Sequence, residues 1–345
     1  MSIFALIDKH PRALLQSGPT PIEHLARLSR ELGVEVFVKR DDLTGLGFGG
    51  NKIRQLEFYF GAALAQGADT VLITGAVQSN YVRAAAAAAA KLGLDAVLQL
   101  EERVPGMSRT YYASGNVLLD DLLGARRLSF PEGENEQGAD QALRDEAERL
   151  RRAGRRPYVI PLALDNPPLG ALGYMLAAKE VVKQGADFDC AVVASGSALT
   201  HAGFLCGLRA LRHPAPVHGA CVRRPAAAQR DRVTTVAAKL ATLLGSAPLL
   251  GNDDILTWDM ALAPGYGRLG PPAREAIAMM ARHEGLFVDP VYTAKSLAVL
   301  IALARDGTIP KGARVLFIHT GGLPALFAYE PELAVASAPA SEVAE

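Results

Sequence analysis

Short apolar runs alternate with longer helical stretches through most of this 345-residue sequence. Each run is brief and largely apolar, as expected for a strand that is covered on both faces. Strands of this kind, joined by crossover helices, form parallel sheets, so the sequence predicts an α/β protein. The predicted strands are residues 34–39, 70–74, 96–100, 158–162, 190–194, 217–222 and 314–318.

The predicted helices lie between these strands, at residues 53–66, 81–92, 108–123, 137–153, 169–184, 200–211, 230–244, 271–283 and 294–304. A glycine beyond the end of a helix is expected to adopt the left-handed conformation that ends it. The glycines in such positions are Gly67, Gly93, Gly154, Gly185 and Gly285.

Composition limits the class of protein. Half of the 345 residues are hydrophobic, enough to build a large core in two domains. Lys plus Arg and Asp plus Glu each number 36, so no net charge attracts nucleic acid or an anionic membrane. Neither an export signal nor the roughly 20 apolar residues of a membrane helix are visible. The cysteines Cys190, Cys206 and Cys221 are expected to be free thiols in a cytoplasmic protein, and residues 337–345 a disordered acidic tail.

Three small polar loops follow predicted strands. They are Gly75-Ala76-Val77-Gln78-Ser79-Asn80, Ser195-Gly196-Ser197-Ala198-Leu199-Thr200 and His319-Thr320-Gly321-Gly322. In a parallel sheet, loops at the carboxyl ends of the strands line the crevice where ligands bind. We therefore expect one site that the three loops share.

Lys52 follows Gly49-Gly50-Asn51 at the start of a predicted helix. The simplest interpretation is an exposed surface lysine. The helix dipole disfavours a cation at this end, however, whereas a neutral amine is tolerated there. The two glycines also let a flat ring approach the backbone. Such an amine can form a Schiff base with an aldehyde.

The segment 195–200 precedes a helix, so its backbone N–H groups and hydroxyls can bind a phosphate dianion. An ordinary Ser or Thr helix cap is the alternative. The segment matches neither a Walker motif nor the glycine fingerprint of nicotinamide-binding enzymes. Together with Lys52 it indicates a cofactor that carries both an aldehyde and a phosphate, for which pyridoxal 5'-phosphate is the obvious candidate.

Further polar residues are candidates for substrate contacts. Gln78, Ser79 and Asn80 offer two amides and a hydroxyl to a carboxylate or a ring oxygen, although Asn80 is also a plausible helix cap. Tyr266 and Tyr292 lie in loops marked by glycine or proline, where a phenol can act as acid or base, orient a substrate, or merely pack. The seven histidines lack metal-ligand spacing, so no metal site is predicted.

Motifs over almost the whole chain resemble, in the same order, the D-cysteine desulfhydrase and aminocyclopropane-carboxylate deaminase family. This family belongs to the fold type II, or tryptophan synthase β-like, pyridoxal-phosphate enzymes. The motifs are Gly18-Pro19-Thr20-Pro21-Ile22, Val38-Lys39-Arg40-Asp41-Asp42-Leu43-Thr44, Gly49-Gly50-Asn51-Lys52-Ile53-Arg54-Gln55-Leu56-Glu57-Phe58, Gln78-Ser79-Asn80, residues 194–203, Asp289-Pro290-Val291-Tyr292 and residues 319–327.

The resemblance implies a two-domain α/β fold in which each domain is a mostly parallel twisted sheet flanked by helices. Residues 1–53 and 166–345 would form the larger, cofactor-binding domain, and residues 54–165 a smaller inserted domain. The cofactor would lie in the cleft between them. A homodimer and a small amino-acid substrate are also implied.

The resemblance further implies roles for individual residues. Lys52 would hold the cofactor as an internal aldimine and, once released, remove the α-proton of the substrate. Ser79, Tyr266 and Tyr292 would complete the catalytic group. The other cofactor-binding residues would be Asn80, Ser197, Ala198, Leu199, Thr200, Thr293, Thr320 and Gly321, and the substrate-binding residues Asn51, Gln78, Ser79, Asn80 and Tyr81.

The implied reaction is an α,β-elimination like that of D-cysteine desulfhydrase, which yields a 2-oxo acid, ammonia and sulfide. The deaminase branch has a glutamate after the tyrosine, where this chain has Thr293, and a hydroxyl cannot keep the cofactor ring nitrogen protonated. Tyr81, residues 163–168 and Ala198-Leu199 depart from the family pattern. They leave open the deaminase, a cysteate sulfo-lyase and a related lyase or racemase, besides a non-catalytic metabolite-binding protein, which would not need Lys52.

Overall fold

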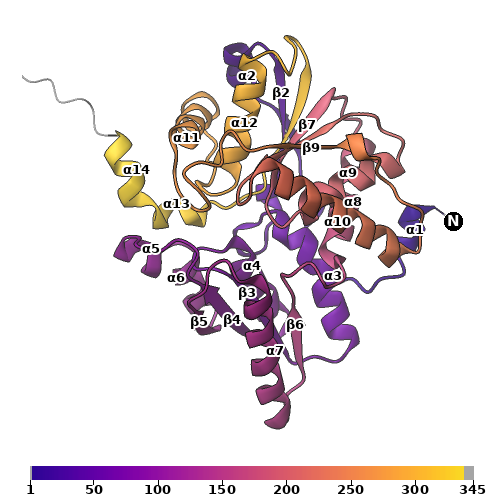
Figure 1. The fold of residues 1–345 in the computed structure, drawn as a ribbon, viewed down its shortest axis with the longest axis vertical. Coiled ribbons are helices and arrows are strands. Elements are labelled where there is room, and N and C mark those ends of the chain that lie inside the picture. The colour runs from indigo at the N-terminus through magenta and orange to yellow at the C-terminus, as the bar shows by residue number, and fades with distance from the viewer. Residues whose placement is uncertain (1, 338–345) are drawn as a thin grey trace, which may run out of the picture.

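The computed structural model describes residues 2–337, and the tail expected to be disordered lies outside them from residue 338 onward. Its strands form two separate sheets, which occupy the upper and lower halves of the molecule in Figure 1. Helices flank both sheets. Apart from the antiparallel pair β1 and β2, all neighbouring strands are parallel, which confirms the predicted α/β class.

The larger sheet has the strand order β1-β2-β10-β7-β8-β9, and the smaller sheet has the order β5-β4-β3-β6. The strands are β1 (Ile22–His24), β2 (Glu35–Lys39), β3 (Thr70–Ala76), β4 (Asp95–Glu101), β5 (Arg126–Phe130), β6 (Pro157–Ile160), β7 (Cys190–Ser195), β8 (Val217–Cys221), β9 (Ile255–Trp258) and β10 (Arg314–Ile318). All seven predicted strands are present. The three that the sequence did not reveal, β1, β5 and β9, are sheet edges, where exposure weakens the apolar signal.

The helices begin and end close to the predicted positions. They are α1 (Ile3–Ile7), α2 (Ala26–Leu32), α3 (Asn51–Ala65), α4 (Asn80–Leu92), α5 (Arg109–Ala113), α6 (Asn116–Leu122), α7 (Glu136–Arg152), α8 (Leu169–Lys183), α9 (Leu199–Ala210), α10 (Ala226–Leu244), α11 (Pro271–Glu284), α12 (Thr293–Arg305), α13 (Pro324–Ala328) and α14 (Glu330–Ser337). The five glycines expected beyond helix ends all have positive φ angles, as predicted.

The prediction of one helix at 108–123 is wrong, because the chain breaks there into α5 and α6. Gly115 has a φ of 61°, and a Cβ at this position would lie 2.7 Å from the Pro324 carbonyl oxygen. The break turns the carbonyl groups of Tyr111 and Ser114 toward the side chain of Gln78, which donates to both at 2.6 and 2.9 Å. A tertiary contact therefore overrides the local helical pattern.

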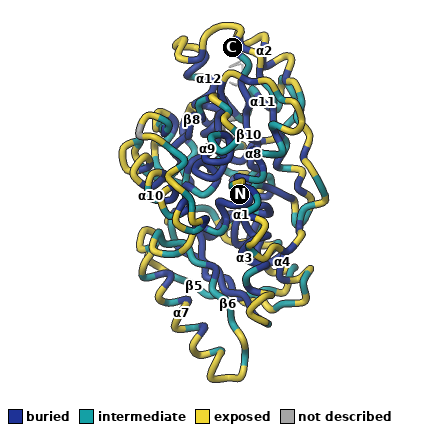
Figure 2. Tube along the Cα trace, turned by 90° about the vertical axis from the view of Figure 1, so that its right-hand side faces the viewer, coloured by how far each residue is buried: buried dark blue, intermediate teal, exposed yellow. Residues whose placement is uncertain are grey.

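Helix α4 shows how small side chains bring the layers together. The alanines of residues 84–89 are all buried. Ala87 lies so close to Gly47 that a Cβ added to Gly47 would be 2.7 Å from the Ala87 Cβ. Figure 2 shows the buried residues along the middle of the molecule and the exposed ones on the outer faces of α7 and α10. None of the helices in the described part of the chain is both long and apolar enough to cross a bilayer.

A buried ionic network holds α3 against the larger sheet. The Arg54 guanidinium, 2 % exposed, lies 2.8 Å from carboxylate oxygens of both Asp41 and Glu180. Lys39 contacts the same Glu180 at 2.6 Å, and the Tyr174 hydroxyl donates to Asp41 at 2.6 Å. These side chains come from α3, β2, the turn after β2, and α8, so the network fixes the position of the helix that carries Lys52.

We expect Arg54→Met to lower the free energy of unfolding by about 3–5 kcal/mol, because it leaves two buried carboxylates without their main partner. Denaturant titration measures this change. The matched control is Arg305→Met, which removes an exposed pair with Glu275 and should cost about 1 kcal/mol or less. Equal losses in the two variants would contradict the role given to the network.

Candidate active site

Lys52 is the second residue of α3, where its half-buried side chain borders a cavity. Its Nζ lies 3.2 Å from Oε1 of Gln55 and 5.0 Å from the ring centroid of Tyr81. Burial lowers the pKa of Lys52 to about 8. The amine is therefore neutral far more often near neutral pH than an ordinary lysine, as a nucleophile or base requires.

The turn before α3 is held by the loop that follows β10. The Asn51 N–H donates to the Thr320 carbonyl at 3.1 Å. Gly50 has a φ of 111°, and a Cβ there would lie 3.0 Å from the same carbonyl oxygen. Gly321, with a φ of 82°, approaches Gly50 so closely that its own Cβ would be 2.8 Å from the Gly50 Cα. The glycines thus permit a close backbone approach behind Lys52.

The loop between β7 and α9 has the features of an anion site. Among the described residues no side chain caps α9, so the N–H groups of its first turn remain available. Ala198 has a φ of 74°, a left-handed conformation unusual for alanine. The Thr200 Oγ1 accepts hydrogen bonds from the Asn51 and Gln55 amides at 2.9 and 2.8 Å. With both lone pairs used, its O–H is left to donate to an anion.

The three polar loops meet as the sequence predicts, because one cavity is lined by residues from all of them. Its lining comprises Asn51, Lys52, Asn80, Tyr81, Ala194, Gly196, Ser197, Ala198, Thr200, Tyr292 and Thr320. An aldehyde at Lys52 and a phosphate at the start of α9 would both lie within this space. The residues present therefore fit pyridoxal 5'-phosphate.

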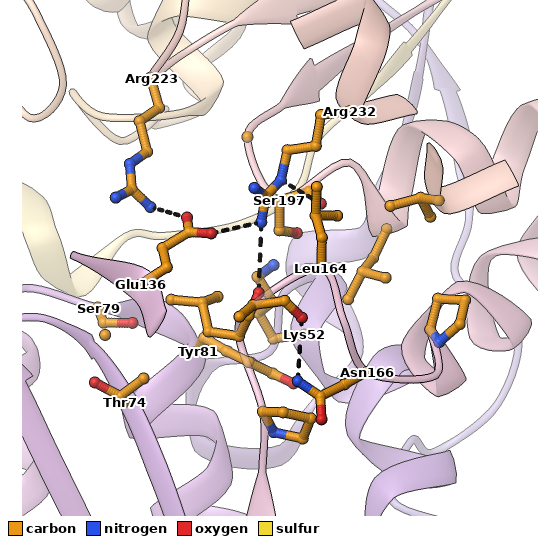
Figure 3. A pocket seen from close by; sticks show the side chains of 18 of the residues that line it. Lys52, Thr74, Ser79, Tyr81, Glu136, Leu164, Asn166, Ser197, Arg223 and Arg232 are labelled. Carbon is orange, nitrogen blue, oxygen red and sulfur yellow. Dashed lines mark hydrogen bonds and ion pairs between the residues drawn. The ribbon is translucent and has the colours of Figure 1, made fainter. Parts of the chain in front are cut away.

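A second, larger cavity adjoins the first and shares Lys52, Tyr81, Gly196, Ser197 and Tyr292 with it. Ser79, Leu199 and Tyr266 also line it, and Figure 3 shows charged side chains on its other side. The hydroxyls of Tyr266 and Tyr292 lie 2.6 Å apart. Burial, and then the neighbouring Tyr266, raise the pKa of Tyr292 well above its usual value, so this phenol keeps its proton.

Ser79 is the N-cap residue of α4, and Asn80 is the first residue of this helix. The Ser79 hydroxyl accepts from the Val82 N–H at 3.2 Å and so caps the helix, while the residue lines the larger cavity. The Asn80 Oδ1 accepts from Asn116 at 3.0 Å, and the residue lines the smaller cavity. Each of these residues therefore makes a structural hydrogen bond and also lines a cavity of the candidate site.

Three predicted site residues do not line either cavity. The amide group of Gln78, predicted to bind substrate, is bound to the backbone around the α5–α6 break. The Thr293 hydroxyl contacts the Asp289 carboxylate at 2.6 Å and lies behind the cavity. Gly321 has no side chain, which lets its backbone lie close to the backbone of Gly50. Of Thr293 and Thr320, both predicted to bind the cofactor, Thr320 is the one at the cavity wall.

Gln55 and the arginines of the larger cavity were not identified as site residues from the sequence. Gln55 is fully buried and joins the Lys52 amine to the Thr200 hydroxyl. Gln55 lies three residues after Lys52, so the two side chains share one helix face. This spacing could have identified Gln55 from the sequence. Arg223 and Arg232 carry no motif, and only the folded chain brings them to the cavity.

Comparison with known proteins agrees with this geometry. A family model described as "Pyridoxal-phosphate dependent enzyme" matches residues 13–321. The chain belongs to this family. Its cofactor is pyridoxal 5'-phosphate, and its architecture is that of the fold type II enzymes.

Individual relatives are similar over nearly their full length. A D-cysteine desulfhydrase of Yersinia enterocolitica is 44 % identical, with 96 % of this chain and 100 % of the relative covered. One of Klebsiella pneumoniae is 43 % identical, with 95 % and 98 % covered. The crystal structure of an ACC deaminase homologue is 38 % identical, with a TM-score of 0.86 over 97 % of this chain and 98 % of that one. O-ureido-L-serine synthase, at 19 % identity and a TM-score of 0.67, shares the fold.

We expect Thr200→Val to weaken cofactor binding about 10- to 100-fold, because it removes a donor to the phosphate and leaves two buried amides without their acceptor. Titration of cofactor-free protein, followed by visible absorbance, gives the dissociation constant. Thr242→Val on the exposed part of α10 is the matched control. Unchanged binding in Thr200→Val would exclude Thr200 from the phosphate site.

Proposed function

We propose that this protein catalyses α,β-elimination on a small β-substituted amino acid, with D-cysteine as the representative substrate. The single observation that carries the proposal is a lysine of lowered pKa in one cavity with an uncapped helix start that fits a phosphate. The family and the D-cysteine desulfhydrase relatives support it.

The reaction balances without an oxidant or reductant. The α-proton is removed, the electron pair of the Cα–H bond becomes the Cα=Cβ double bond, and the Cβ–S pair leaves with sulfur as hydrosulfide. The 2-aminoacrylate that is released takes up water and yields pyruvate and ammonia. Bound pyridoxal phosphate supplies the electron sink that makes the α-proton acidic.

The chain's own residues would divide this work as follows. The neutral Lys52 amine takes the α-proton, with Gln55 fixing its position. Ser79 and Asn51 hold the substrate carboxylate. Tyr292, which keeps its proton and contacts Tyr266, donates to the departing group or to a substrate oxygen.

The deaminase alternative is less well supported by the cavity walls. Among the described lining residues of both cavities, Glu136 is the one carboxylate, and it is already bound to Arg223 and Arg232. The smaller cavity instead offers neutral polar groups, among them the hydroxyl of Thr320 and the amides of Asn51 and Asn80. A purely metabolite-binding role leaves the lowered pKa of Lys52 at the cavity without an explanation.

We also propose the domain division and assembly that the family pattern implies. Residues 54–165 contain all strands of the smaller sheet, which supports their assignment as an inserted domain. The remaining residues would form the cofactor-binding domain, and two copies would form a homodimer. A cytoplasmic location fits the three free, buried cysteines.

The decisive experiment compares wild type with Lys52→Ala. We expect purified wild type to show visible absorbance with added cofactor and to release 2-oxo acid from D-cysteine and β-chloroalanine. Lys52→Ala should lose both properties, with 2-oxo acid release falling by a factor of about 10³ or more. L-cysteine, D-serine and aminocyclopropane carboxylate complete the panel. Release from the last compound at the rate of the thiol substrates would favour the deaminase instead.

The lowered pKa of Lys52 makes the rate of cofactor attachment pH-dependent. Since the neutral amine reacts, the rate should rise about tenfold per pH unit below pH 8 and level off above it. Rapid mixing of cofactor-free protein with cofactor, followed by absorbance, measures this rate between about pH 6 and 10. A free lysine amine in the same buffers corrects for titration of the cofactor itself. A rate that levels off only above pH 10 would contradict the effect of burial.

A further inference from the structure

The larger cavity has an excess of cationic side chains that removal of a thiol does not explain. Arg103, Arg223, Arg232 and Lys239 line it besides Lys52, and Glu136 is the one acidic residue among the described lining residues. The cavity also contains the proposed catalytic Tyr292 and Ser79. Arg103 is paired with Glu101, and Arg223 with Glu134 and Glu136, so carboxylates of the protein offset part of the positive charge of this lining.

The arginines already bind a carboxylate of the protein itself. Glu136, the first residue of α7, receives contacts from three guanidinium groups: Arg223 at 2.5 Å, Arg224 at 2.6 Å and Arg232 at 3.0 Å. We call these three residues the arginine cluster. Burial alone would raise the pKa of Glu136, but the cluster holds it below its usual value. Figure 3 shows Glu136 between Arg223 and Arg232, so the cluster presents donors suited to an oxyanion.

The position of Arg232 links the cluster to the reaction site. Its side chain is 7 % exposed, and its Nε donates to the Ser197 carbonyl at 3.3 Å. Ser197 borders both cavities, next to the expected cofactor phosphate. Arg103, which also lines the larger cavity, is held by Glu101 at 2.8 Å, and its guanidinium lies 5.9 Å from the ring centroid of Tyr266. The larger cavity thus has one guanidinium group next to Ser197 and another near Tyr266.

We propose that the arginine cluster, with Arg103, is a subsite for an anionic β-substituent, and that the protein acts on small amino acids whose leaving group carries an oxyanion, such as a sulfonate or a phosphate ester. This inference rests on the proposed elimination. The substituent replaces Glu136 as the partner of Arg223 and Arg232. The Cβ–S or Cβ–O electron pair then leaves with sulfite or phosphate, and 2-aminoacrylate is hydrolysed as in the thiol reaction.

The other interpretation is that the cluster only joins the two halves of the molecule, since Glu136 belongs to α7 and its partners lie beyond β8 and in α10. The two interpretations differ in substrate dependence. A joining contact affects every substrate alike, whereas an anion subsite affects only those with a charged substituent.

The test uses the cofactor-loaded protein with D- and L-cysteate, O-phosphoserine and β-chloroalanine, and compares KM values. Arg223→Gln and Arg232→Gln should each raise the ratio of the oxyanion KM to the β-chloroalanine KM by about tenfold. Glu136→Gln should lower this ratio, because it removes the competing carboxylate. Arg223 contacts Glu134, Glu136 and the Gly133 carbonyl, so its variant leaves the phosphate loop untouched. Arg305→Gln is the remote control.

A ratio that stays constant in all three variants would overturn the subsite, and so would turnover of β-chloroalanine without turnover of any oxyanion substrate. If no substrate reacts, the proposed elimination is wrong. The anion subsite is then tested separately, by measuring ligand binding. Calorimetric titration of cysteate and of serine into Lys52→Ala should then show preferential binding of cysteate, weakened about tenfold by adding Arg223→Gln. Equal binding of the two compounds would overturn it.

Discussion

The buried contact of Arg54 with Asp41 and Glu180 is the interaction on which the site depends. Arg54 lies two residues beyond Lys52 on α3, and its partners belong to the turn after β2 and to α8. An arginine without these carboxylates would be an uncompensated buried charge, so the three elements are held in one arrangement. The same helix packs on α8 so closely that a Cβ at Gly173 would lie 2.1 Å from the Arg54 carbonyl oxygen. Lys52 is thus placed by ionic and steric constraints that act on its neighbours.

The reactivity of Lys52 follows from this placement. Its pKa falls because the surrounding walls remove water from the ammonium form. Gln55 then connects the amine to Thr200, so that the proposed phosphate position and the reactive nitrogen share one hydrogen-bonded support. The starts of the two helices α3 and α9 are thereby linked, so the lysine and the proposed phosphate position would act as one unit.

Charge is distributed unevenly around the two cavities. The smaller cavity is lined by backbone groups, amides, hydroxyls and one lysine, whereas arginines gather at the wall of the larger one. The Glu136 carboxylate contacts all three guanidinium groups of the arginine cluster and offsets the repulsion between their charges. The chemistry common to the family and the selection of a particular β-substituent can therefore reside in separate parts of the same cleft.

Much of the fold could be predicted because its signals are local. Buried parallel strands give continuous apolar runs, glycines end helices, and ligand loops follow strands, so seven strands, most helices and the three converging loops were predictable. Three of the four edge strands, β1, β5 and β9, were missed because their exposure weakens the apolar signal. The helix at 108–123 was predicted wrongly because Gln78 binds the carbonyl groups at its break. The sequence by itself determined the layered fold, the candidate lysine and the loop proposed to bind phosphate, since each depends on neighbouring residues. Only the tertiary structure decided that Thr320 and not Thr293 reaches the cavity, and that Glu136, Arg223 and Arg232 meet there, because these contacts join segments whose separation along the chain carries no local signal.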